Sequence, residues 1–577
     1  DADFDCWMRW VTLQPVFRRI FGCSFLPDHD YGKGGKGWRD LWQDLLSLIL
    51  IEPEHVRASL IENFNGVRID GTNATIIGSG KGEFIADRNA ITRVWMDHGA
   101  WPVLTVLLYL DQTGDTDFLF EPAAYFRDAQ MSRTRRKDFK GEPAADQCLL
   151  TRGGEVYTGT VLEHMLVQTL TQFFNVGEHN LIRLESADWN DGLDMAFDRG
   201  ESVAFSSFYA ANLKRLADWL EYLQKEKGIM SVEVFQELTI LLDQPDGVCC
   251  DYDDVQEKQR LLFEIYCPAV EPHLSGRKVA VECGLLIQDM RRKAEWIFQK
   301  IRSQEKICVS HQGKDYQWFN GYYDNQGRRV EGQGDGSIRM TLTGQVFTVM
   351  SGLADEDEIR EIIASVDAFL KDAHGGVRLN TDFGLRNYLD LGRAFSFAYG
   401  TKENGAVFSH MAVMYACALY MRGFAREGFE VLNALFRMSS DFAVSRMHPN
   451  LPEYFDGQGR GMYGYLTGSA SWMVLTLLTQ AFGVRGEKGD LILDPKLVRE
   501  QFSPDGSASV KSSFAGRELT VHYQNPKRLD AGVYRVREVK ANGPALSFET
   551  LDNGALRLSR EHLQNILGPL EVTVYLA

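Results

Sequence analysis

Apolar side chains recur at every third or fourth position through most of the first 480 residues. The clearest such stretches are 41–52, 161–174, 206–226, 279–302 and 412–436. This spacing places the apolar residues on one face of a helix, so each stretch is predicted to form an amphipathic α-helix. Residues 1–21 show a similar pattern and predict another helix at the start of the chain.

Polar, glycine-rich loops separate the predicted helices. Four of them read ADWNDGLD, EGQGDGS, YGTKENG and MYGYLTGS. Long helices that alternate with long loops are typical of a helical toroid with its functional residues gathered on the loops at one end. A helical solenoid would give a similar string, although the short repeats of the well-known solenoids are not found.

Two parts of the chain differ from this pattern. Residues 225–315 are charge-rich and helical in pattern, which indicates an insertion packed outside the main body. After residue 485, apolar and polar residues alternate and turn signals such as Asp-Asn-Gly appear, as is typical of antiparallel strands. We therefore expect a helical body over 1–484 and a small antiparallel β domain over 485–577, and we expect the two to pack together.

Composition and charge narrow the class of partner. The net charge of -17 disfavours nucleic acid and anionic membranes, because both require a basic surface. No apolar run is long enough to span a membrane. The nine cysteines are scattered without metal-binding spacing, which favours the reducing cytoplasm and no metal site. Since the chain opens inside a helix and not at Met, we expect a preceding segment or a second chain.

The loop ADWNDGLD, residues 187–194, carries the first candidate chemistry. It holds Asp188, Asp191 and Asp194 beside Trp189. Cleavage of a glycosidic bond needs a carboxylic acid against the leaving oxygen, often with a pKa raised by an apolar neighbour or another carboxylate. A tryptophan supplies such a neighbour and a flat surface for a sugar ring. The alternative is an Asp-rich turn in which Asp191 caps a helix.

The adjacent Arg39 and Asp40 in GKGWRDLWQD form the second candidate. Such a pair can bind vicinal sugar hydroxyls, because the guanidinium donates hydrogen bonds and the carboxylate accepts them. The alternative is a helix start in which Asp40 lies near the positive end of the helix dipole.

The third candidate is GTKENGAVFSH, in which Lys402, Glu403 and Asn404 precede a predicted helix that contains His410. Free amides and a cationic side chain at a helix start suit an anion. The alternative is simple capping, with His410 a buried structural residue.

The fourth candidate is MYGYLTGSASW, where Thr467 and Gly468 precede another helix. Free amides and hydroxyls converge at such a turn and suit an oxyanion or phosphate. The pattern is not that of a P-loop.

A fifth motif, RVWMDHGAW, brings Trp95, Asp97, His98 and Trp101 together. These residues are equally compatible with a sugar groove and with a buried aromatic cluster around an ion pair.

Taken in order, WRDxxQD, ADWNDGxD, GTKENGxxFSH and YLTGSASW resemble the inverting disaccharide and oligosaccharide phosphorylases of glycoside hydrolase family 94. The resemblance covers nearly the whole chain. It implies a mainly α fold, an (α/α)6 barrel catalytic body with a small C-terminal antiparallel β domain. Family members also carry an N-terminal β-sandwich and a helical linker, neither of which is visible here.

The resemblance also implies roles for the residues at matching positions. The general acid falls on Asp191. The sugar-binding positions fall on Arg39, Asp40, Trp189, Lys402 and Glu403. The phosphate-binding positions fall on His410, Thr467 and Gly468. A further phosphate-binding arginine of the family has no aligned counterpart in residues 200–216, so another Arg or Lys is expected to replace it.

Within the family, residues 25–44 and 66–101 are most similar to the corresponding stretches of 1,2-β-oligoglucan (sophorose) phosphorylases. This implies a hexosyltransferase that reversibly converts β-1,2-linked gluco-oligosaccharides and inorganic phosphate into α-glucose 1-phosphate and a shortened chain. Phosphate is then a co-substrate, and no metal or organic cofactor is implied. The alternatives are a phosphorylase of another β-glucoside, such as cellobiose or laminaribiose, and an inverting glycoside hydrolase with a second carboxylate that activates water.

Overall fold

The computed structural model describes most of the 577-residue chain. The described residues are all those outside 1, 22–35, 78–83, 86–92, 129, 132, 134–135, 138–146, 245–246, 335, 385–387, 448 and 465–466. Among them, none of the helices has the length and apolar character needed to cross a bilayer.

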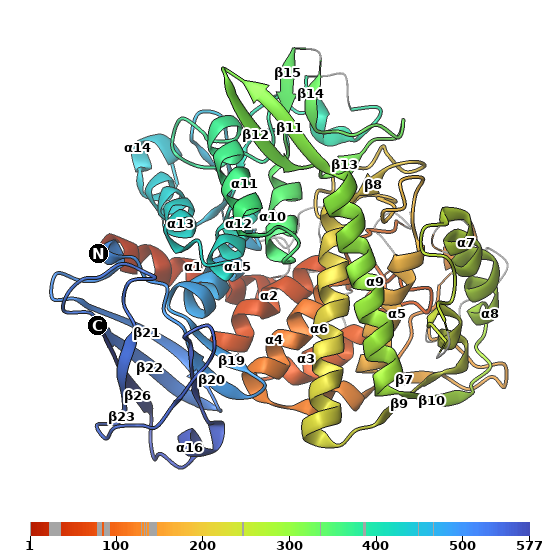
Figure 1. Ribbon diagram of the computed structural model, residues 1–577, viewed down its shortest axis with the longest axis horizontal. Coiled ribbons are helices and arrows are strands. Elements are labelled where there is room, and N and C mark those ends of the chain that lie inside the picture. Colours follow the sequence, from red (N-terminus) through yellow and green to blue (C-terminus); the bar gives the residue numbers. More distant parts are fainter. Residues whose placement is uncertain are drawn as a thin grey trace.

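Six helices of the described residues form a closed cycle, here called the helical ring, in which each packs against the next (Figure 1). They are α2 (Trp38–Ile51), α4 (Ala100–Thr113), α6 (Val203–Lys227), α10 (Leu342–Met350), α12 (Ser409–Met421) and α15 (Ser469–Thr476). The cycle closes because α15 packs against α2, although more than 400 residues separate them in the sequence.

A second set of helices packs on the outside of the ring. These are α1 (Ala2–Phe21), α3 (Val56–Phe64), α5 (Val161–Phe174), α9 (Cys283–Gln304), α11 (Glu356–Phe369) and α13 (Ala425–Ser440). For example, α5 packs on α4 and α6, α9 on α6, and α13 on α12. An outer helix follows each ring helix except the last and carries the chain back, so successive ring helices start from the same end.

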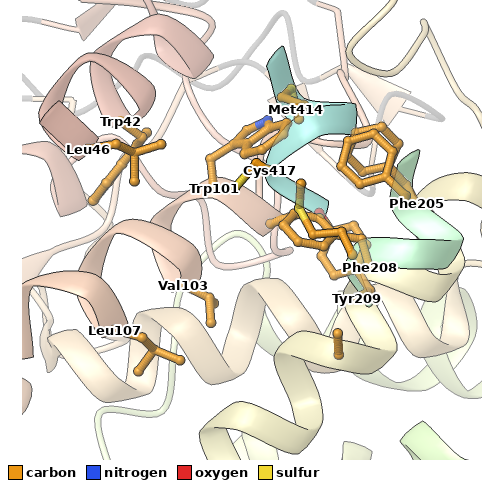
Figure 2. Packing of buried hydrophobic residues seen from close by; sticks show 14 of the residues in the cluster. Trp42, Leu46, Trp101, Val103, Leu107, Phe205, Phe208, Tyr209, Met414 and Cys417 are labelled. Atoms are coloured by element: carbon orange, nitrogen blue, oxygen red, sulfur yellow. The ribbon is translucent and has the colours of Figure 1, made fainter. Parts of the chain in front are cut away.

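Aromatic side chains fill the space between the ring helices (Figure 2). Trp101 of α4 is fully buried, and its ring centroid lies 5.5 Å from that of Phe208 and 5.9 Å from that of Phe205, both on α6. Trp42 of α2 and Met414 of α12 are also fully buried in the hydrophobic cluster. Large rings contribute much buried apolar area per residue, so the middle of the ring is a packed core.

The predicted helices agree with the structure to different degrees. The stretch 161–174 coincides with α5. The stretch 279–302 begins as strand, because residues 278–282 pair with 231–235 and α9 starts only at Cys283. The stretch 412–436 is two helices, since the chain turns between α12 and α13 at Gly423, whose φ of 86° lies in the left-handed region.

The prediction of a mainly α body has to be corrected, because the chain is a mixture of helices and strands with several small sheets. The paired strands are β1 (Lys36–Gly37), β2 (Ile76–Ile77) and β3 (Phe84–Ile85); β4 (Pro122–Ala124) and β7 (Thr158–Thr160); β5 (Gln130–Met131) and β6 (Arg136–Lys137); β8 (Glu201–Ser202) and β13 (Tyr322–Tyr323); β9 (Ser231–Phe235) and β10 (Lys278–Glu282); β11 (Lys306–His311) and β12 (Lys314–Phe319); β14 (Gly332–Gly334) and β15 (Ser337–Arg339); and β16 (Val407–Phe408), β17 (Pro452–Phe455) and β18 (Gly461–Gly464). Most are too short for a period-2 pattern to be recognised in the sequence.

The predicted insertion at 225–315 contains strands as well as helices. It includes β9, β10, α7 (Val255–Arg260), α8 (Cys267–Val270) and a π-helical stretch, Leu261–Tyr266, between them. Its last helix, α9, packs along α6 of the ring. A further short helix, α14 (Phe442–Ser445), follows α13.

Two four-stranded sheets follow the helical body. One has the order β19 (Val484–Glu487), β20 (Asp490–Leu493), β25 (Leu556–Leu558), β24 (Glu549–Thr550), and the other the order β21 (Ser507–Phe514), β22 (Arg517–Gln524), β26 (Leu570–Leu576), β23 (Val536–Ala541). The strands β22 and β26 are parallel, so the expected purely antiparallel domain is in fact mixed. The chain between them passes through β23 to β25 and α16 (Arg560–Gln564), which is long enough for a parallel connection.

The sheets pack against the ring, as expected from the absence of a flexible linker. The Gln112 side chain at the end of α4 donates to the Ser513 carbonyl at 3.0 Å and accepts from the Gly486 amide at 2.9 Å. The Ser512 hydroxyl donates to the Leu50 carbonyl at the end of α2 at 3.1 Å.

A small stability effect is expected at the start of α5. The Thr160 hydroxyl accepts from the Glu163 amide at 3.1 Å and caps this helix. Thr160→Ala should lower the free energy of unfolding by about 1 kcal/mol, measured by urea denaturation. Thr158→Ala, at an exposed position of β7 that caps no helix, is the control. An equal effect of both substitutions would contradict the capping argument.

Candidate active site

The loops that precede the ring helices meet at the end where those helices begin. Arg39, in the first turn of α2, hydrogen-bonds Asp97, which lies just before α4. It also donates to Asp191, on the loop before α6, at 2.8 Å. Because the N-termini of several ring helices converge here, the partial positive charges of their free amides converge as well, and this favours an anion.

Arg39 and Asp97 form a buried, two-pronged ion pair. The Arg39 Nε lies 2.5 Å from Asp97 Oδ2 and Nη2 lies 3.0 Å from Oδ1, while the Trp101 indole donates to Oδ2 at 2.7 Å. Burial alone would raise the pKa of Asp97, but Arg39 and then His98 outweigh it and hold that pKa below its usual value. The motif RVWMDHGAW is therefore the buried aromatic cluster with an ion pair, the second of its two interpretations.

The three aspartates of ADWNDGLD have different surroundings. Asp188 is fully buried and accepts from the Asn190 amide at 2.9 Å and the Ser202 hydroxyl at 3.0 Å. Asp194 pairs with Arg393. Asp191 has a side chain that is 48% exposed, so a substrate can reach it.

The electrostatics of Asp191 suit an acid. Burial by the surrounding protein raises its pKa, and Arg39 opposes this shift. The interpretation of Asp191 as a helix cap is wrong, because α6 begins at Val203 and its cap is Ser202.

The buried carboxyl of Asp188 is expected to make the stability of the protein depend on pH. Burial raises the pKa of Asp188 from its ordinary value of 3.8 to about 7. Between these values the folded protein holds a proton that the unfolded chain releases, so this group destabilises the fold increasingly as the pH rises from about 4 to about 7. Asp188→Asn removes the titration. The stability of the wild-type chain relative to this variant should fall across that range in urea denaturation, and parallel pH curves would contradict the assignment.

Asp40 and Arg39 do not act as a free pair. Asp40 lies in the first turn of α2, as its structural interpretation predicted, with its side chain 35% exposed. Arg18 of α1 lies 3.0 Å from Asp40 and 2.8 Å from Asp44. The Arg39 donors are directed at Asp97, Asp191 and the Asp188 carbonyl. Asp40 is therefore the member of the pair that remains accessible to sugar hydroxyls.

The KENG loop reaches the same place. Lys402 has a left-handed φ of 49°, and its ammonium lies 5.2 Å from the Phe397 ring centroid and 5.5 Å from that of Tyr463. Burial and then the charge of Asp191 raise the pKa of Glu403, so Glu403 lies within electrostatic reach of the candidate acid. The helix α12 that follows has no side-chain cap, which disfavours the capping interpretation of this loop.

His410 is buried beside Trp189 at the start of α12. Its Nε2 lies 2.8 Å from Gln43 Oε1, and its ring meets that of Trp189 edge-on at 5.4 Å. Burial lowers the pKa of His410 to about 3. Trp189 is only 6% exposed, so most of its surface packs against protein and only a small part remains for a sugar.

Thr467 and Gly468 lie next to His410. The Thr467 hydroxyl accepts from the Ser469 amide at 3.0 Å at the start of α15. A Cβ on Gly468 would lie 2.9 Å from His410 Cε1, so only glycine allows this close approach. The structure thus brings His410 and the Thr467–Gly468 turn together, as the sequence predicted.

Sequence reasoning missed two charged residues of this region. Burial and then Glu403 raise the pKa of Glu453 on β17 to about 7. Burial lowers the pKa of His410, Asp40 opposes this shift, and the charge of Arg18 lowers the pKa further. Arg18 therefore lies within electrostatic reach of His410 and is a candidate for the missing phosphate-binding cation. The pairing of β16 with β17, with Phe408 opposite Tyr454, brings Glu453 near the KENG loop, and no short motif marks such a pairing.

No group of three or more His, Cys, Asp or Glu side chains suited to a metal ion occurs within the described ranges.

Comparison with known proteins supports a family relationship. Residues 150–237 and 288–483 match the family model described as "Glycosyl hydrolase 94 superfamily, catalytic domain". The matched ranges contain Asp191, His410 and Thr467, while Arg39 and Asp40 lie outside them.

The sequence relatives include proteins named as a phosphorylase and as a glucan synthase. The chain is 21% identical over 512 residues to "Solabiose phosphorylase" of Paenibacillus borealis, covering 87% of this chain and 53% of the relative. It is 23% identical over 525 residues to "Cyclic beta-(1,2)-glucan synthase NdvB" of Rhizobium meliloti, covering 89% of this chain and 16% of the relative. The chain thus spans about half the length of the first relative and a much smaller part of the second.

Among solved structures, the chain is similar to a GH78 family rhamnosidase of Bacillus sp. GL1. The TM-score is 0.45 at 10% identity, with 92% of this chain and 41% of that chain covered.

Proposed function

We propose that this chain is an inverting glycoside phosphorylase with Asp191 as its general acid. The match of residues 150–237 and 288–483 to the glycosyl hydrolase 94 superfamily model supports this proposal. The observation that carries this proposal is the position of Asp191: an accessible carboxyl with a raised pKa, held by Arg39 at the end of the ring that also carries His410 and Gly468. An acid must hold its proton until it meets the leaving oxygen, and a raised pKa favours this.

The proposed reaction is a single displacement. Phosphate attacks the anomeric carbon from the face opposite the leaving group, while Asp191 donates a proton to the glycosidic oxygen. The new bond to phosphate has the α configuration, and the departing sugar leaves with its hydroxyl restored. Phosphate arrives ionised, so no water-activating base is needed. In the reverse direction Asp191 acts as the base.

The remaining site residues divide into two groups. Asp40, Trp189, Lys402 and Glu403 are proposed to contact the donor sugar, with Arg39 orienting the acid. His410, Thr467 and Gly468 are proposed to hold phosphate, assisted by the free amides at the start of α15. Phosphate is then a co-substrate, and no metal or organic cofactor takes part.

The finer assignments rest on the motif resemblance. We propose that the substrate is a β-1,2-linked gluco-oligosaccharide, sophorose or longer. We also propose that the ring and its outer helices are an (α/α)6 barrel. The free thiols of Cys249 and Cys250 are compatible with the cytoplasmic location that we propose.

The direct test incubates β-1,2-glucan oligosaccharides with the protein, with and without inorganic phosphate. We expect α-glucose 1-phosphate to form only when phosphate is present. Reverse reactions from α-glucose 1-phosphate, with glucose, sophorose, laminaribiose and cellobiose as acceptors, then test the linkage. Failure with sophorose alone would discard the β-1,2 assignment and leave the reaction type intact.

An inverting hydrolase remains the second candidate because of Glu453. Its raised pKa and its proximity to Glu403 provide a second carboxyl at this end of the ring. A hydrolase would use it to activate water. Release of free glucose without phosphate, abolished by Glu453→Gln, would support that alternative.

A further inference from the structure

The side chain of Gln43 determines which nitrogen of His410 carries the proton. Gln43 Oε1 lies 2.6 Å from the Trp472 indole nitrogen and 2.8 Å from His410 Nε2. An indole N–H can only donate, so the atom of Gln43 that faces it must be the amide oxygen. The same oxygen faces His410, and His410 Nε2 must therefore carry a hydrogen.

The orientation of this amide has a cost. Gln43 is buried, and its Nε2 has no hydrogen-bond partner among the described residues. The reverse orientation would place an amide N–H against the indole N–H. The arrangement therefore leaves one donor unsatisfied in order to keep the oxygen between Trp472 and His410.

The other ring nitrogen of His410 is left as an acceptor. Within the part of the chain that the structure describes, His410 Nδ1 has no hydrogen-bond partner, although the residue is only 7% exposed. A neutral imidazole with its hydrogen on Nε2 presents a lone pair at Nδ1. The lowered pKa of His410 favours this neutral form.

Nδ1 lies beside the turn that starts α15. A Cβ on Gly468 would be 3.4 Å from Nδ1. An anion bound at this turn would therefore receive hydrogen bonds from free amides on one side and meet a lone pair on the other. An oxyanion that carries its own O–H can donate to that lone pair, whereas a fully deprotonated oxyanion meets it with repulsion.

We propose that Gln43 is a positioning residue that fixes His410 as a hydrogen-bond acceptor, so that the anion subsite selects a protonated oxyanion, hydrogen phosphate or hydrogen arsenate, over sulfate. The proposal deepens the proposed function and rests on it for the location of the anion. It concerns binding only, and the anion keeps its proton at this step.

The test measures anion binding to the intact chain by isothermal titration at neutral pH, with inorganic phosphate, arsenate and sulfate as probes. Sulfate lacks the hydrogen bond to Nδ1 and meets a repulsive contact in its place, so its binding should be at least about tenfold weaker than that of phosphate. Arsenate should bind like phosphate. Equal binding of sulfate and phosphate would overturn the proposal.

Two variants test the role of Gln43. Gln43→Leu removes the acceptor, so the hydrogen of His410 can move to Nδ1, and the preference over sulfate should approach unity while KM for phosphate rises more than kcat falls. Gln43→Glu keeps an acceptor for Trp472, but its charge favours the imidazolium, whose Nδ1–H can donate a hydrogen bond to sulfate. Unchanged selectivity in a folded variant would contradict the proposal.

The matched control is Gln112→Leu. Gln112 is also buried and its side chain also makes two hydrogen bonds, but it lies at the far end of α4. It should keep the wild-type selectivity. If the protein prefers phosphate to sulfate but shows no phosphorolysis, the proposed function fails and the assignment of the anion subsite stands. If phosphorolysis proceeds and sulfate binds as well as phosphate, the proposed function stands and the role of Gln43 fails.

Discussion

Replacement of Asp191 by asparagine should lower the rate of glycosidic cleavage by about 10²–10⁴-fold, because the leaving oxygen would no longer receive a proton in the transition state. The amide has nearly the same shape and still accepts from Arg39, so sugar and phosphate binding should be largely retained. Steady-state kinetics of α-glucose 1-phosphate formation, together with titration calorimetry, separate the two effects.

The matched control for this prediction is Asp194→Asn, three residues along the same loop. Asp194 pairs with Arg393 at the protein surface, and we expect its loss to leave the rate within a few-fold of the wild-type value. If the protein only binds carbohydrate, neither the wild type nor the variants will form α-glucose 1-phosphate. Full activity of Asp191→Asn would remove Asp191 from the mechanism.

The second large effect is expected from Arg39→Met. Asp97 is fully buried and depends on this guanidinium for two of its contacts. Removing one partner of a buried ion pair leaves an uncompensated charge and typically costs about 3–5 kcal/mol of stability. Urea denaturation should show this loss, and a change below about 1 kcal/mol would contradict the importance of the pair.

Two further variants test whether the unpaired charge of Asp97 causes the loss of stability. Arg39→Met combined with Asp97→Asn removes both charges and should recover a substantial part of the stability. Arg57 makes two ion pairs as well, with Asp115 and Glu121, but its side chain is 42% exposed. Arg57→Met should therefore cost less than about 1 kcal/mol, although it breaks the same number of ion pairs.

Periodicity predicted the helices better than the strands. The 14 residues of α5 have a regular apolar pattern and were located without error, since the helical period is determined within the segment itself. The pairing of β16 with β17 joins residues 407–408 to 454–455, and no local pattern reports a partner more than 40 residues away. The parallel pairing of β22 with β26 was missed for the same reason.

The candidate site was predictable where its residues lie in short loop motifs. Asp191, His410 and Gly468 each belong to a recognisable string, and the structure places them on the same end of the ring. Glu453 and Gln43 were not identified, because their importance comes from neighbours that lie far from them in the sequence. Such neighbours depend on how the ring closes, and that is a property of the whole chain.

The contact that closes the ring can form only late in synthesis of the chain. Ser471 on α15 donates to the Gln43 carbonyl on α2 and lies 2.8 Å from the Ser47 hydroxyl, 424 residues away. A ribosome adds roughly 5–20 residues per second, so α2 waits on the order of half a minute for its last partner. During that interval the face of α2 that packs against α15 stays uncovered. The part of the candidate site around His410 and Gly468 is therefore among the last to form, whereas Arg39, Asp97 and Asp191 can meet much earlier in synthesis.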